Sequence, residues 1–157
     1  MIRVTRSVVI NRPAAEVGRY LADIERQTEW SDMTVSRKLT EGPVRAGTRA
    51  YGEVAMGPVK LGWTWEVIDV DPERGMSYRT ISKSSLGMDG SLRLSPEGPT
   101  ATRVDAVVEV RTRGVLRVLE PLLRGEITRN EAGELDRLKA VLEREAARTP
   151  VAGEAIA

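Results

Sequence analysis

The chain has 157 residues, a length typical of a single domain that buries its own core. It contains no cysteine and no histidine, which excludes disulfides, thiolate chemistry and histidine-based hydrolytic sites, and we expect no metal and no cofactor. Lys and Arg total 24 against 23 Asp and Glu, a net charge of +1 with both signs interleaved, so nucleic acid is not an expected partner.

The opening residues predict a strand followed by a helix. Residues 2–10, IRVTRSVVI, alternate and are rich in β-branched side chains, as in strands. Pro13 suits the first helical position, with Asn11 or Arg12 in the capping region. One helix face is then formed at i, i+3, i+4 and i+7 spacing by Val17, Tyr20, Leu21 and Ile24. A second short helix or a turn is expected over residues 25–29.

From residue 33 to residue 112 the sequence predicts consecutive antiparallel strands. Short segments with Gly, Pro and Ser interrupt the chain at regular intervals, as expected for a meander of hairpins. In the segment DPERG, Asp71 begins a turn, Pro72 fixes φ at the second position and Gly75 is free to take a positive φ.

The last long segment, residues 115–148, has a helical period. Its apolar residues form one broad stripe: Leu116, Leu119, Leu122, Leu123, Ile127, Leu135, Leu138 and Leu142. Pro121 lies within it and is expected to kink or restart the helix. Residues 1–148 are predicted to form the single domain, and residues 149–157 a flexible tail.

Strand parity places Trp63 and Trp65 on the same inward face, in a chain with only one other tryptophan and no phenylalanine. Glu53 and Glu66 fall on the solvent face. The two tryptophans either fill the core or form the wall of a pocket, and parity alone leaves both interpretations open. The leucine stripe is the only large apolar surface available to cover the inward face of the sheet.

Several segments, in this order, resemble one known family. They are RPAAEV at 12–17, Trp30 near the second helix, GT at 47–48, WEVIDVDPERGMSYR at 65–79, T-x-V at 102–104 and LKAVLE at 138–143. Together they are similar to the polyketide cyclase/dehydrase and lipid-transport branch of the START and birch-pollen-allergen-like (SRPBCC) superfamily, over roughly residues 2–147.

The resemblance implies an α+β helix-grip fold. In this fold a curved seven-stranded antiparallel sheet wraps round a long C-terminal helix, two short helices follow the first strand, and a cavity lies between sheet and helix. Members bind sterols, lipids, polyketides, quinones or plant hormones, and some are cyclases, aromatases or dehydratases. Catalytic members often use a cavity histidine, which this chain lacks.

Parity and the resemblance together give a set of candidate ligand-binding residues. These are Val54, Met56, Trp63, Trp65, Tyr78, Thr80, Leu119, Leu123 and Ile127. Tyr78 is also the weak candidate for a catalytic group, because a tyrosine can act as a general acid; its alternative role is a packed anchor whose hydroxyl is satisfied.

Three functions are compatible with these features. The first is binding or carriage of a small hydrophobic or amphipathic molecule, such as a lipid, polyketide or quinone-like compound. The second is a polyketide cyclase, aromatase or dehydratase that positions its substrate in the cavity. The third is an interaction module with a vestigial cavity. Under each of the three functions the protein is expected to be a monomer or a homodimer. The charged N-terminus and the absence of about 18 consecutive apolar residues predict a cytoplasmic protein without a transmembrane segment.

Overall fold

The computed structural model describes residues 1–148. Strand β1 (Ile2–Ile10) leads into helix α1 (Ala14–Leu21) and the 3₁₀ helix η1 (Ile24–Glu29), and the chain ends in the long helix α2 (Val115–Arg148). Between them lie β2 (Met33–Lys38), β3 (Arg49–Met56), β4 (Val59–Asp71), β5 (Gly75–Thr80), β6 (Leu86–Pro96) and β7 (Thr102–Thr112). The tail predicted at residues 149–157 lies outside the described residues.

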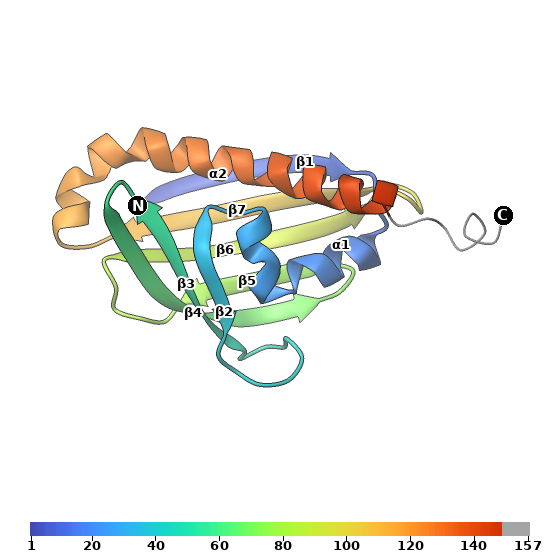
Figure 1. Cartoon of the computed structure of the whole chain (residues 1–157), viewed down its shortest axis with the longest axis horizontal. Helices are drawn as coiled ribbons and strands as arrows, with labels where there is room; N and C mark the ends of the chain where they lie inside the picture. The colour runs from blue at the N-terminus through green and yellow to red at the C-terminus, as the bar shows by residue number, and fades with distance from the viewer. Residues whose placement is uncertain (149–157) are drawn as a thin grey trace.

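The strands form one seven-stranded sheet in the order β1-β7-β6-β5-β4-β3-β2, and every neighbouring pair is antiparallel. Neighbours in the sheet are consecutive in the chain except for β1, which pairs with β7. Figure 1 shows α2 running along the curved sheet beside β1, with α1 near the C-terminal end of α2. The predicted α+β helix-grip fold, with two short helices after the first strand, is confirmed.

Local chemistry explains the tight connection between β4 and β5. The Asp71 side chain accepts hydrogen bonds from the backbone N–H groups of Glu73 (2.9 Å) and Arg74 (3.2 Å). Gly75 follows with φ of +109°, and a Cβ atom there would lie 1.8 Å from the Leu92 carbonyl oxygen. The turn predicted from DPERG therefore forms, and only glycine fits at its exit.

The core lies between the concave face of the sheet and one face of α2. Leu135, Leu138 and Leu142 are buried there, whereas Leu119 and Leu122, predicted in the same stripe, are 38% and 79% exposed. At 3.6 residues per turn, position 122 points about 140° away from position 127. The stripe prediction was therefore wrong for Leu119 and Leu122, whereas Leu116 and Leu123 pack against the core as half-buried side chains.

Two further details concern the proline positions of α2 and α1. Helix α2 continues through Pro121, so of the two outcomes expected there, a kink or a restart, the restart does not occur. Pro13 is the N-cap residue of α1 and not its first helical residue, and its carbonyl accepts a hydrogen bond from the Val17 N–H at 3.1 Å. Within residues 1–148, no helix is long and apolar enough to cross a membrane.

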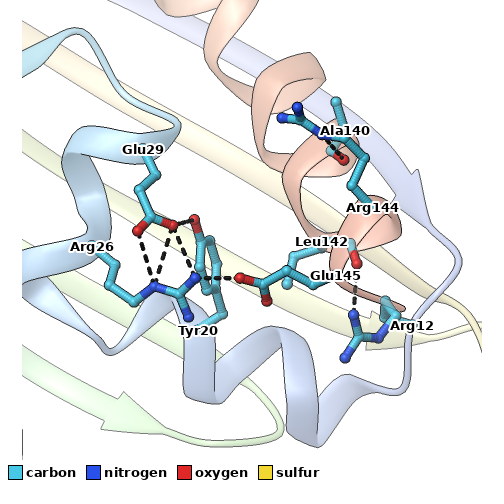
Figure 2. Close-up of polar contacts among 8 residues, drawn as sticks. All are labelled: Arg12, Tyr20, Arg26, Glu29, Ala140, Leu142, Arg144 and Glu145. Carbon is cyan, nitrogen blue, oxygen red and sulfur yellow. Dashed lines mark hydrogen bonds and ion pairs between the residues drawn. The ribbon is translucent and has the colours of Figure 1, made fainter. Parts of the chain in front are cut away.

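A polar network fastens the C-terminal end of α2 to α1 and η1 (Figure 2). The Arg26 guanidinium donates to Glu29 at 3.1 Å, contacts Glu145 of α2, and stacks over the Tyr20 ring at 4.6 Å from its centroid. Nearby, Arg12 donates to the Leu142 carbonyl oxygen at 2.6 Å. The hydrogen bond from Arg26 holds the pKa of Glu29 below its ordinary value. This end of α2 is consequently held in place by both leucines and charges.

Candidate functional site

A cavity of about 110 Å³ lies between the sheet and α2. All seven strands and α2 contribute side chains to its wall, and most of these are apolar or aromatic. The apolar and aromatic lining consists of Val4, Trp30, Met33, Val54, Ala55, Met56, Trp63, Trp65, Tyr78, Leu86, Met88, Leu92, Ala106, Val108, Val110, Ile127 and Leu135. A site of this kind binds by shape and apolar contact, with a few polar groups to orient the ligand.

Trp63 and Trp65 both line the cavity, and each is only 3% exposed. Gly52 is the cross-strand neighbour of Trp63, and a Cβ atom on Gly52 would lie 2.8 Å from the Met33 sulfur and 3.5 Å from the Trp63 ring. The glycine thus makes room for both side chains. The sequence left open whether each tryptophan is a core residue or part of a cavity wall. In the structure both tryptophans are buried in the core and also line the cavity.

Tyr78 lies in the middle of the cavity wall, edge-on to Trp65 with 5.6 Å between ring centroids. Its hydroxyl lies over Gly90, where a Cβ atom would approach it to 2.7 Å. Burial, followed by the charges of Glu131, Glu134 and Asp89, raises the pKa of Tyr78 well above its ordinary value. Tyr78 therefore stays neutral and is equipped to donate a hydrogen bond, not to act as a base.

The polar lining residues come mainly from two segments that meet at one end of the cavity. Gln27, Ser31 and Asp32 belong to η1 and the segment after it, and Asn130, Glu131 and Glu134 belong to the middle of α2; Arg6 of β1 is the remaining one. The Asp32 N–H donates to Glu134 Oε1 at 3.0 Å and so joins the two segments. The cavity consequently has an apolar body and a polar end.

Glu131 and Glu134 lie on adjacent turns of α2 and form a pair of carboxyl groups that both line the cavity. Burial is the main cause that raises their pKa values, to about 7 for Glu131 and about 9 for Glu134. The nearby Asp32 adds to both increases, and the Glu131 charge raises the pKa of Glu134 further. Near neutral pH the pair therefore keeps at least one proton and can donate as well as accept hydrogen bonds.

Asp32 is paired on one side only. Its Oδ1 accepts a 2.8 Å bond from Arg137, whose Nε also donates to the Trp30 carbonyl oxygen at 3.0 Å. Burial raises the pKa of Asp32 although Arg137 opposes this. Among the described residues, three buried atoms lack a hydrogen-bond partner: Asp32 Oδ2, Trp30 Nε1 and Trp65 Nε1. All three residues line the cavity.

The structure brings six of the nine predicted ligand-binding residues to the cavity wall. These are Val54, Met56, Trp63, Trp65, Tyr78 and Ile127. Thr80 is not among the lining residues, because its hydroxyl donates to the Met88 carbonyl at 2.8 Å and accepts from the Met88 N–H at 2.7 Å.

Leu119 and Leu123 of α2 are also absent from the lining. Leu119 is 38% exposed, and Leu123 packs against the core as a half-buried side chain. Near them the inner face of α2 is occupied by Glu120, which is 9% exposed and accepts a hydrogen bond from the Thr112 hydroxyl.

Sequence reasoning missed the carboxyl pair, although a signal was present. The stripe of α2 passes from Ile127 to Leu135, a gap of two helical turns, and position 131 lies between them on the same face. A glutamate at the centre of an apolar stripe is unusual because a lone buried carboxylate is costly. That break in the pattern marked Glu131, and the i+3 position then marked Glu134.

The acidic residues do not gather as metal ligands. Within residues 1–148, no group of three or more Asp and Glu side chains is arranged so that it could hold a metal ion. The acidic side chains of the cavity can act through hydrogen bonding and proton transfer.

Comparison with known proteins places this geometry in a family. The family model described as polyketide cyclase/dehydrase and lipid transport matches residues 1–143. A search among curated proteins found no match.

Several solved structures share the fold. The Zhui aromatase/cyclase from Streptomyces sp. R1128 is 20% identical with a TM-score of 0.77, covering 92% of this chain and 94% of its own. TTHA0849 from Thermus thermophilus is 20% identical with a TM-score of 0.75, covering 94% and 99%. A START superfamily protein from Mycobacterium smegmatis is 14% identical with a TM-score of 0.69, covering 90% and 97%.

Proposed function

Because the chain belongs to the polyketide cyclase/dehydrase and lipid transport family, we propose that it binds a small, mainly apolar molecule in the cavity between the sheet and α2. The observation that supports this most is the division of the cavity into an apolar body and a polar end. The apolar body of a ligand would lie against Trp63, Trp65 and the methionines, and its polar group would face the Glu131–Glu134 pair. Such a protein would act as a carrier or a sensor.

The size of the cavity bears on which molecules enter. At about 110 Å³ it is smaller than the roughly 300–1,000 Å³ of pockets for drug-sized ligands. Met33, Met56 and Met88 line it, and methionine is unbranched and changes rotamer easily. A ligand of one aromatic ring requires the smallest rearrangement of these side chains, and a longer one requires more of them to move.

A second function, catalysis of the cyclase or dehydratase type, is favoured by one observation. Glu131 has a pKa near neutrality inside the cavity, which suits a general acid or base, and Tyr78 can donate a proton or a hydrogen bond beside it. An enzyme of this kind would lose turnover of its substrate with Glu131→Gln while still binding it. A carrier would keep its binding and show no turnover to lose.

Binding is tested with isopropylbenzene as an apolar probe and with Trp63→Ala and Trp65→Ala. We expect the probe to change tryptophan fluorescence and to bind several-fold more weakly to at least one variant. Truncation of a fully packed aromatic costs about 3–5 kcal/mol in stability, and a cavity wall packed on one side should cost clearly less. Native mass spectrometry of the purified protein is expected to show a co-purified small molecule.

Two results would contradict the proposed binding function. Full stability loss in both tryptophan variants, together with unchanged probe affinity, would mean that the two rings only fill the core. If no co-purified small molecule is found and no single-ring probe binds, the binding function itself is contradicted.

A further inference from the structure

Two hydrogen-bond donors in the cavity wall have no acceptor within the described residues. The indole N–H groups of Trp30 and Trp65 are buried and unpartnered, and the two residues are only 5% and 3% exposed. Both line the cavity. An indole N–H can only donate, so a group that satisfies it must supply an acceptor atom.

The carboxyl pair that lines the same cavity adds a third donor. Burial raises the pKa values of both Glu131 and Glu134, so the pair keeps at least one proton near neutral pH. Glu134 also accepts from the Asp32 N–H at 3.0 Å, and this contact fixes its position. When Glu131 is protonated as well, its O–H is free to donate into the cavity.

The charges around the pair disfavour an anionic ligand. The charged and titratable groups that face it are Asp32 after η1, Tyr78 of β5, Arg6 of β1 and Arg137 of α2. Arg137 is already bound to Asp32 at 2.8 Å. A carboxylate in the cavity would lose its hydration, and Arg6 is the one described lining residue with a positive charge to compensate it, so the cost of burying the anion would weaken its binding.

We propose that the polar end of the ligand is an uncharged hydrogen-bond acceptor of the carbonyl type, received by the indole N–H groups of Trp65 and Trp30 and by the protonated carboxyl group of Glu131. The apolar remainder of the ligand lies against the rings of Trp63 and Trp65. Carboxylates, such as free fatty acids, are excluded, and amines are disfavoured because they would leave both indole N–H groups without an acceptor. This inference rests on the proposed binding function.

Four probes of nearly the same shape test it on the full chain. They are isopropylbenzene, acetophenone, benzoate and 1-phenylethylammonium, each titrated into ¹⁵N-labelled protein at about pH 5.5. An engineered apolar cavity of about 150 Å³ holds benzene, so ligands with one aromatic ring are a reasonable match in size. We expect acetophenone to bind at least about fivefold more tightly than isopropylbenzene and far more tightly than benzoate. We also expect acetophenone alone to shift the Trp65 indole N–H signal downfield.

Two variants separate hydrogen bonding from packing. Trp65→Phe keeps an aromatic ring but removes the N–H, so it should weaken acetophenone binding and leave isopropylbenzene binding nearly unchanged. Glu131→Gln keeps a donor that cannot ionise. The wild-type protein should bind acetophenone about tenfold more weakly at about pH 8.5 than at about pH 5.5, since Glu131 loses its proton between them. Glu131→Gln should bind it equally at both.

A matched control lies on the same helix. Glu126 is exposed and outside the cavity lining, so Glu126→Gln should keep the wild-type dependence on pH. Equal affinity for acetophenone and isopropylbenzene would overturn the inference and leave the binding function standing. Tightest binding of the ammonium or benzoate probe, or an unchanged pH dependence in Glu131→Gln, would overturn it too. If none of the four probes binds, the inference fails, and the proposed function fails with it when no small molecule co-purifies.

Discussion

The two halves of α2 are built in opposite ways. In the C-terminal half, Leu138 and Leu142 are at most 1% exposed, and Arg12 and Arg26 tie the helix to the first part of the chain. In the N-terminal half, Val118 and Leu122 are each 79% exposed. The carboxyl pair lies between the two. Only one half of the helix is thus required to position the polar end of the cavity, and stability should depend on that half far more than on the other.

The largest expected contrast is between two leucines of this helix. Leu138→Ala should lower the free energy of unfolding by about 2–5 kcal/mol, because Leu138 is fully buried and its truncation leaves a void. Leu122→Ala should change it by no more than about 0.5 kcal/mol. Urea denaturation of both variants measures the difference. Similar losses in the two variants would show that the halves are equally packed.

The next effect concerns the carboxyl pair and pH. The folded-state pKa of Glu131 is raised from 4.5 to about 7. The folded protein therefore holds a proton that the unfolded chain releases, and the free energy of unfolding falls as pH rises from about 4.5 to about 7. Glu134, whose pKa is raised to about 9, adds a fall of its own that continues to about pH 9. Glu131→Gln cannot ionise and should lack only the Glu131 part of the fall, so its stability relative to the wild type should increase by about 1.4 kcal/mol for each pKa unit of the Glu131 shift.

The pH effect is measured by denaturation at several pH values with Glu126→Gln alongside. The control glutamate is exposed and should follow the wild-type curve. A Glu131→Gln curve parallel to that of the wild type across this range would show that Glu131 is not desolvated in solution.

The smallest effect is expected in the polar network at the end of α2. Arg26 and Glu145 are both partly exposed, with side-chain exposures of 39% and 36%, so solvent screens their attraction. A double-mutant cycle with Arg26→Ala and Glu145→Ala should give a coupling of about 0.2–1 kcal/mol, which decreases with added salt. Coupling well above this range would mean that charges, and not leucines, fix this half of the helix.

Most of the fold could be predicted from the sequence, because the residue pattern of each segment agrees with the order in which strands and helices follow one another. The alternation of residues 2–10, the DPERG turn and the period of the last helix each gave the observed element. The burial of Leu119 and Leu122 was mispredicted, because apolar residues were assigned to one helix face by their type alone and not by the 100° rotation from each residue to the next. Leu122 matched the composition of the stripe but not its direction.

The site could be predicted only in its apolar part. Strand parity brought Trp63, Trp65 and Val54 to the wall, because alternate side chains of a strand share a face. The polar end depends on the meeting of η1 with the middle of α2, about 100 residues apart in sequence, as in the bond between Asp32 and Glu134. No local pattern encodes that meeting. The only trace in the sequence was the glutamate that interrupts the apolar stripe.

The contour of the cavity is set by glycines as much as by aromatic rings. Gly52 and Gly90 face Trp63 and Tyr78 across neighbouring strands, and a methyl group at either position would collide with a side chain that now occupies the space. A single added carbon would displace the Met33 side chain at Gly52 or the Tyr78 ring at Gly90, and so change the shape of the cavity at its wall. Substitutions at these glycines can therefore change the size of ligand that fits the cavity, while the hydrogen-bonding groups that recognise the ligand stay unchanged.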